Sequence, residues 1–96
     1  MYGTVARLQV KPGNEAALLE EMGNFDRQHV PGAVSVRCYR TDTNPGEVYM
    51  VVEFESSATY KANANSPEQD ARFRALRALL TADPEWHDGE IIYQSK

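Results

Sequence analysis

Three side chains in this 96-residue chain are the main candidates to move a proton or hold a polar ligand. His29 titrates near neutral pH, so it could serve as a general base. Tyr60 and Asn63 lie one helical turn apart in a predicted helix, so together they could hold a hydroxyl or carbonyl oxygen. The structural alternatives are that His29 caps a helix C-terminus, that Tyr60 packs, and that Asn63 belongs to the polar end of a short helix.

Four more aromatic residues could form the walls of a ligand site, although each is first a candidate for the core. Phe25, Phe54 and Phe73 would supply the apolar walls that an aromatic substrate needs. Trp86 is a further candidate for substrate binding, but at its position a tryptophan more often covers the core edge or contacts a second subunit. We interpret the neighbouring His87 as solvated.

The composition excludes several other classes of site. Two histidines at unrelated positions and a single cysteine, Cys38, provide no metal-ligand spacing, and the glycines are scattered among turns. A net charge of −4 argues against a nucleic-acid partner. No apolar run is long enough for a signal peptide or a membrane span. We therefore expect a cytoplasmic protein without metal or other cofactor.

The first strand and helix are predicted from hydrophobic periodicity. Apolar side chains alternate over residues 4–10, which indicates a half-buried strand that Lys11-Pro12-Gly13 breaks. Asn14 is the predicted N-cap of the following helix, and Pro31-Gly32 ends it. One face of this helix is formed by side chains spaced by four, three and four residues, namely Leu18, Met22, Phe25 and His29.

Residues 33–39 and 47–55 are predicted to form two strands around a turn-rich segment at 41–46, which indicates a hairpin. Val34, Val36 and Cys38 share one side of the first of these strands. When the apolar side chains of both strands lie on one face, Arg37 is placed opposite or diagonal to Glu53 on the other face.

Two helices and a last strand complete the chain. The helices are predicted over residues 56–65 and from Ser66-Pro67 to Asp83-Pro84, and the strand over residues 90–94. The second of these helices carries two i,i+4 pairs of favourable orientation, Glu68 with Arg72 and Asp70 with Arg74.

The resulting order, β-α-β-β-α-α-β in a single domain over residues 1–96, predicts an α+β, ferredoxin-like fold. In this fold a four-stranded antiparallel sheet carries its helices on one face. The other face is too apolar to remain fully exposed to solvent and too charged to form the core of a monomer, so we expect a homodimer. The polar and aromatic residues predicted at this interface are Arg7, Arg37, Tyr39, Tyr49 and Glu53.

Five segments resemble the antibiotic biosynthesis monooxygenase domain family, within the dimeric α/β barrel superfamily. They are Lys11-Pro12-Gly13, Pro31-Gly32, Pro45-Gly46-Glu47, residues 60–67 and residues 86–90. The resemblance implies a dimeric α/β barrel with a cavity between sheet and helices in each protomer. It implies an oxidoreductase, a monooxygenase that oxidises a small polycyclic phenol or quinol with dioxygen and needs no metal or flavin. His29 would then be a candidate base for a phenolic proton.

Two other functions remain open. The first is a non-catalytic homodimer that binds a small ligand or is purely structural; in the structural case Phe25, Phe54 and Phe73 would fill the cavity. The second is haem binding, because a haem-degrading branch uses an asparagine on the first strand, a tryptophan on the sheet and a helix histidine. Residues 2–10 contain no asparagine and residues 47–55 no tryptophan, so this alternative ranks third.

Overall fold

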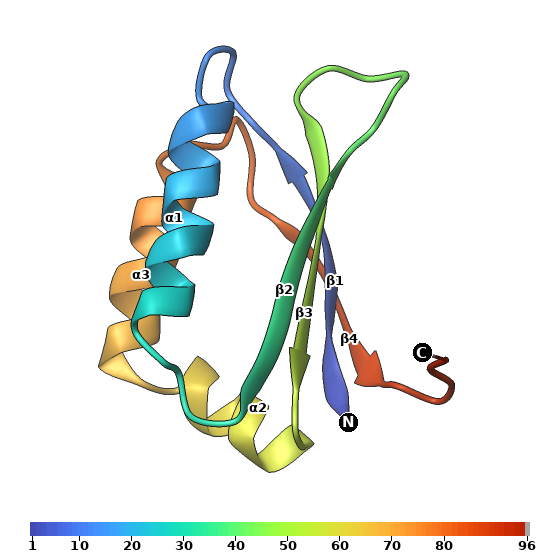
Figure 1. The fold of residues 1–96 in the computed structure, drawn as a ribbon. Coiled ribbons are helices and arrows are strands. Elements are labelled where there is room, and N and C mark those ends of the chain that lie inside the picture. The colour runs from blue at the N-terminus through green and yellow to red at the C-terminus, as the bar shows by residue number, and fades with distance from the viewer. Residues whose placement is uncertain (96) are drawn as a thin grey trace.

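The computed structural model describes residues 1–95 and confirms the α+β, ferredoxin-like architecture (Figure 1). Helices α1 and α3 cover one face of a four-stranded antiparallel sheet, and α2 lies at one end of it. The elements are β1 (Tyr2–Gln9), α1 (Glu15–Arg27), β2 (Ala33–Arg40), β3 (Glu47–Phe54), α2 (Ser57–Ala64), α3 (Pro67–Arg77) and β4 (Glu85–Glu90). Within residues 1–95 no helix combines the length and apolar character needed to cross a membrane.

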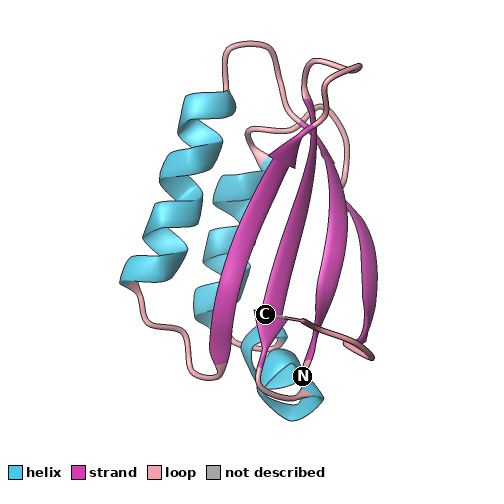
Figure 2. Ribbon diagram, turned by 45° about the vertical axis from the view of Figure 1, so that its right-hand side comes forward, coloured by secondary structure: helices cyan, strands magenta, loops and turns pink. Residues whose placement is uncertain are grey.

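The strand order is β2-β3-β1-β4, so β1 lies inside the sheet and pairs with both β3 and β4 (Figure 2). Ala6 of β1 lies opposite Met50 on one side and Trp86 on the other. Two residues earlier, Thr4 lies opposite Val52 and Asp88. Because side chains two residues apart on a strand share a face, the side chains of both sets of paired residues point toward the helices.

Serine caps start the second and third helices. The side chain of Ser56 accepts a hydrogen bond from the Thr59 backbone N–H, and Ser66 accepts one from that of Gln69. Each bond satisfies one of the backbone donors that a helix start leaves free. Asn14 occupies the N-cap position of α1 as predicted, but its side chain makes no capping hydrogen bond.

Helix α1 ends at Arg27, so the prediction that His29 continues its apolar face is wrong. Gln28 is the C-cap residue and His29 follows with φ of 49°, in the left-handed region. A left-handed residue at this position, most often glycine, is a common way to end a helix. Pro31 follows two residues later and also disfavours helical backbone before it. The turn carries the His29 side chain into solvent.

Strand β2 differs from its predicted alternation at one residue. Ala33 pairs with Phe54 and Ser35 with Glu53, so Val34 lies in a bulge. Val34 is 51% exposed and does not share the buried side of Val36 and Cys38.

Beyond the bulge the predicted side-chain faces are correct. Arg37 lies opposite Val51, which places it diagonal to Glu53 on the face away from the helices.

Strand β4 begins and ends earlier than predicted, at Glu85–Glu90 instead of residues 90–94. Tyr2, at the start of β1, already pairs with Glu90, and the Ile91 N–H donates to the Met1 carbonyl, so the strand pairing is complete before Ile92. Ile92 is 93% exposed there, although its apolar character suggested a strand. As a result Trp86 lies within the strand and not in the loop before it.

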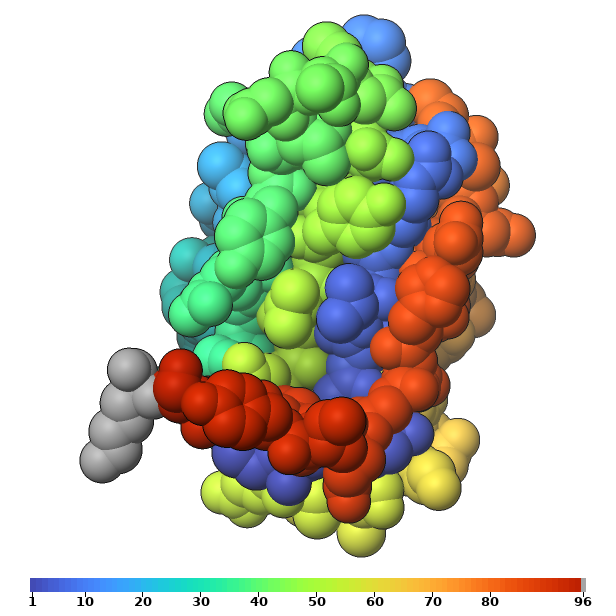
Figure 3. All heavy atoms as spheres, turned by 90° about the vertical axis from the view of Figure 1, so that its right-hand side faces the viewer, coloured from blue at the N-terminus to red at the C-terminus, as the bar shows by residue number. Residues whose placement is uncertain are grey.

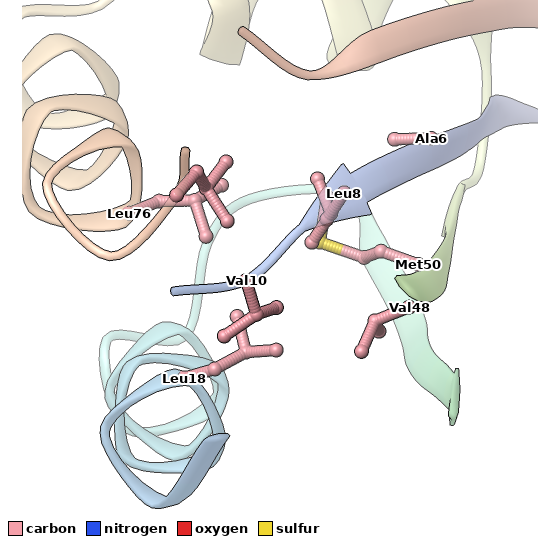
Figure 4. Packing of buried hydrophobic residues seen from close by; sticks show 8 residues of the cluster. Ala6, Leu8, Val10, Leu18, Val48, Met50 and Leu76 are labelled. Carbon is pink, nitrogen blue, oxygen red and sulfur yellow. The ribbon is translucent and has the colours of Figure 1, made fainter. Parts of the chain in front are cut away.

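Aliphatic side chains fill one half of the space between sheet and helices (Figure 4). Leu8 of β1, Leu18 of α1 and Leu80 after α3 are completely buried and belong to this cluster. Burying such a side chain contributes about 1.5–3 kcal/mol to folding. The other half of the same space is hollow.

Candidate functional site

A cavity of about 450 Å³ occupies this hollow half, bounded by the sheet and all three helices. Its volume lies within the range of small-molecule sites. The six residues predicted to bind substrate all line it: Phe25, Phe54, Tyr60, Asn63, Phe73 and Trp86. The aromatic side chains therefore surround the space and do not fill it, contrary to what a purely structural dimer requires.

Aromatic rings form two of the cavity walls. Phe73 of α3 and Trp86 of β4 lie with ring centroids 6.3 Å apart. On another wall Tyr60 meets Phe54 edge to face at 5.4 Å and Tyr2 at 5.2 Å. Such walls suit a flat, apolar ligand, because aromatic pairs prefer tilted or offset contacts at these distances.

Tyr60 is held at the cavity by a hydrogen bond as well as by its ring. Its hydroxyl donates to Oδ1 of Asp88 at 2.8 Å. Burial, together with the nearby Asp88 carboxylate, raises the pKa of Tyr60 to about 12, while the Thr4 hydroxyl, which lies near the Tyr60 oxygen but does not meet hydrogen-bond geometry with it, acts in the opposite direction. Tyr60 is therefore a neutral hydroxyl at ordinary pH, with its proton directed at Asp88 and its oxygen lone pairs available.

Thr4 is a cavity residue that the sequence analysis did not identify. Its side chain is only 4% exposed, and its Oγ1 has no hydrogen-bond partner among residues 1–95. A buried hydroxyl left without a partner costs about 1–3 kcal/mol. In the sequence Thr4 is one member of an alternating strand pattern, and only the register that places it beside Asp88 reveals its position.

Arg72 carries a positive charge into the cavity wall. Its guanidinium donates to three neutral side-chain oxygens, Oδ1 of Asn63 at 2.7 Å, Oε1 of Gln69 at 2.9 Å and Oε1 of Gln28. The guanidinium carbon also lies 5.6 Å from the centre of the Phe25 ring. Because amide oxygens carry no net charge, these contacts hold the arginine in place without neutralising it.

The two ion pairs predicted on α3 have different outcomes. Asp70 and Arg74 form the predicted pair at 2.8 Å. The predicted contact of Glu68 with Arg72 is wrong, because Arg72 turns toward the amide groups at the cavity instead.

Tyr60 and Asn63 therefore belong to different polar groups within one cavity. Tyr60 lies with Thr4 and Asp88, whereas Asn63 bonds Arg72 and donates from Nδ2 to Gln69 Oε1 at 3.2 Å. The spacing of one helical turn predicted that both would face the cavity, but not that they would have different partners.

The two histidines lie outside the cavity lining. His29 is exposed beyond the C-terminal end of α1, and no cavity residue contacts it by a hydrogen bond among those the structure describes. His87 is exposed as predicted, with Nε2 3.2 Å from Oε1 of Glu85. No cluster of three or more metal-ligating side chains occurs in residues 1–95.

The residues predicted for the dimer interface lie together on the sheet face opposite the helices (Figure 3). Arg7 binds Glu47 there, with Nε 2.6 Å from Oε2. The same face exposes apolar surface, since Tyr39 is 53% and Val5 43% exposed. Residues 91–95 cross one end of it.

Comparisons with known proteins relate both the sequence and the fold to a family. The family model described as "Antibiotic biosynthesis monooxygenase" matches residues 1–75. No curated protein sequence matches the chain.

Several solved structures share the fold. A protein from Bordetella bronchiseptica named as an antibiotic biosynthesis monooxygenase is 17% identical, with a TM-score of 0.80 over 96% of this chain and 97% of that one. One of the same description from Deinococcus radiodurans is 13% identical, with a TM-score of 0.79 over 100% and 97%. A conserved protein from Methanosarcina mazei is 20% identical, with a TM-score of 0.77 over 99% and 92%.

Proposed function

The chain belongs to the antibiotic biosynthesis monooxygenase family, and we propose that it oxidises a small polycyclic phenol or quinol with dioxygen. The observation that carries this proposal is the aromatic-walled cavity of about 450 Å³ with polar groups at its edge. A flat polycyclic ring fits such walls, and the polar groups can fix the orientation of its oxygen atoms. The names of the structural relatives support the type of reaction.

In the proposed reaction the substrate supplies the electrons that reduce dioxygen. A deprotonated phenol is electron-rich enough to react with O₂ and to form a carbon–oxygen bond at the ring carbon opposite its hydroxyl. The resulting hydroperoxide loses water and leaves a carbonyl. Phenol and O₂ thus give a quinone and water, and each product receives one of the two oxygen atoms of O₂. No further reductant is needed, so metal and flavin have no required part.

The cavity residues would assist by favouring the phenolate and by excluding water. The positive charge of Arg72 would favour an anion in the cavity, in opposition to the carboxylates of Glu21, Asp70 and Asp88 that also line it. The aromatic walls, among them Phe73 and Trp86, replace water around the ring.

We also propose that the protein is a homodimer whose subunits pair through the sheet face away from the helices. The exposed Val5 and Tyr39, beside charged Arg37 and Glu53, support this arrangement. Light scattering should give about twice the mass of one chain. A mass near 10.8 kDa across micromolar concentrations would contradict the proposal.

Oxygen uptake with a panel of polycyclic phenols and quinols tests the activity directly. We expect turnover well above the autoxidation rate in buffer, and a decrease of about tenfold or more in Tyr60→Phe or Asn63→Ala. His29→Ala is the matched control, because this side chain lies outside the cavity. If uptake stays at background with every compound, the protein is better described as a non-catalytic homodimer that binds a small ligand.

A further inference from the structure

We propose that Thr4, Tyr60 and Asp88 form a subsite for one phenolic hydroxyl of the ligand. This inference rests on the proposed function and deepens it, because it states which group of the ligand enters the polar end of the cavity. Thr4 and Asp88 would then be residues that determine specificity, in addition to the predicted Tyr60.

The buried hydroxyl of Thr4 is the first reason for this assignment. Its neighbour on the same face of β1, Ala6, is apolar and completely buried, as is Leu8 beyond it. A threonine in this row costs stability unless its Oγ1 finds a partner, and residues 1–95 provide none. Because Thr4 lines the cavity, a ligand can provide that partner.

Three different elements bring the polar atoms of this subsite together. Thr4 of β1 and Asp88 of β4 are directly paired residues, so their side chains leave the sheet side by side on the helix face. Tyr60 reaches the same place from α2, with its hydroxyl 2.8 Å from Asp88 Oδ1. Its ring is fixed by contacts with Tyr2 and Phe54. The subsite therefore exists before any ligand binds.

The donor and acceptor pattern of the subsite matches a phenolic hydroxyl. Since the Tyr60 hydroxyl already donates its hydrogen bond to Asp88, its oxygen remains available to accept a hydrogen bond from the ligand. Thr4 Oγ1 has its own proton free to donate to the ligand. A phenol both donates and accepts through one oxygen, whereas an ether or a methyl group cannot do both.

The same contacts provide a path for the phenolic proton. The ligand O–H bond breaks as a new O–H bond forms at the Tyr60 oxygen, and the original Tyr60 proton moves to the Asp88 carboxylate. Tyr60 is neutral before and after the transfer, so no tyrosinate has to form. The phenolate that remains accepts hydrogen bonds from Tyr60 and from Thr4, and the proton on Asp88 can leave to solvent because Asp88 is exposed.

Fluorescence of the single tryptophan provides an assay that needs no turnover. Trp86 lines the cavity, so a bound quinone should quench its emission. The probes are 2-hydroxyanthraquinone and 2-methylanthraquinone, which differ by a hydroxyl in place of a methyl group of similar size. We expect the wild-type protein to bind the hydroxyl compound about tenfold more tightly, as one or two net hydrogen bonds allow.

Thr4→Val tests the central residue with almost no change in shape. Affinity for the hydroxyl compound should fall about fivefold, while affinity for the methyl compound should stay within about twofold. Thr4→Ser keeps the hydroxyl and should retain the preference. Like Thr4→Val, Tyr60→Phe should reduce the preference for the hydroxyl compound, because it removes a second polar atom of the subsite. Equal weakening of both compounds in Thr4→Val, or no change for either, would overturn the inference.

Thermal unfolding separates a ligand role for Thr4 from a structural one. Thr4→Val should unfold at the same temperature as the wild-type protein or higher, because it removes an unpaired buried hydroxyl. A clearly lower midpoint would show that the hydroxyl has a partner within the protein, and would overturn the subsite. If Thr4→Val loses the hydroxyl preference but no phenol supports oxygen uptake, the subsite stands and the monooxygenase proposal fails. If a phenol supports oxygen uptake but Thr4→Val keeps the hydroxyl preference, only the subsite is rejected.

Discussion

The two halves of the space between sheet and helices are built from the same strands but in opposite ways. In one half Leu8, Leu18 and Leu80 are completely buried and belong to one aliphatic cluster. In the other half Phe25, Phe73 and Trp86 stand around a cavity of about 450 Å³. Along β1 the change occurs within two residues, between Ala6 and Thr4.

The filled half therefore contributes mainly to stability, and the hollow half mainly to ligand binding. Aliphatic side chains that interlock stabilise the fold through burial and close packing. The aromatic side chains of the hollow half cover less of one another and keep open the volume that a ligand would occupy. Substitutions in the two halves should therefore affect different measurements, and this expectation can be tested residue by residue.

The largest effect should come from the filled half. Leu8→Ala should lower the free energy of unfolding by about 2–5 kcal/mol, because it leaves a cavity where packing is complete. Urea unfolding followed by circular dichroism measures this loss. A change below about 1 kcal/mol would mean that the filled half is more loosely packed than the structure indicates.

The next largest effect should come from Phe73 at the cavity wall. Phe73→Leu should weaken binding of 2-hydroxyanthraquinone about tenfold, since it removes a flat wall beside Trp86. Its free energy of unfolding should fall by less than about 1.5 kcal/mol, since the side chain is only partly buried. A large loss of stability with unchanged binding would reverse the assignment of the two halves.

A smaller effect should appear in the titration of Tyr60. Its pKa is raised from 10.0 to about 12 in the folded protein, so its contribution to stability is complete below pH 10 and is lost as pH rises toward 12. Absorbance of tyrosinate should show one late ionisation near pH 12 that is missing in Tyr60→Phe. If the two titrations match over this range, Tyr60 is not buried beside Asp88.

The smallest effect is expected for His29, which belongs to neither half. His29→Ala should leave oxygen uptake and quinone affinity within about twofold of wild type, because the side chain is exposed beyond α1. His29→Gly should stabilise the protein slightly, because glycine adopts positive φ without strain. A large loss of uptake in His29→Ala would restore the histidine as a candidate base.

Periodicity predicted the side-chain faces well wherever a strand or helix had a long apolar pattern. The alternation of β1 and β3 placed Phe54 toward the helices and Tyr49 away from them, and the turn spacing of α2 placed Tyr60 and Asn63 at one cavity. The pattern failed at ends and irregularities. His29 fits the spacing of α1 but lies past its end, and Ile92 was predicted to be in a strand but lies past the end of β4 and is 93% exposed.

The order of elements, the faces of the long strands and the aromatic character of the site follow from local periodicity and residue type, so they could be predicted from the sequence. Which of these side chains contact one another depends on how the strands and helices pack together. Strand register, set by the pairing of β1 with β4, places Thr4 beside Asp88, and the docking of α2 brings Tyr60 to them. The same packing leaves the space between the aromatic residues open, since a cavity depends on how far the helices lie from the sheet and not on any one residue.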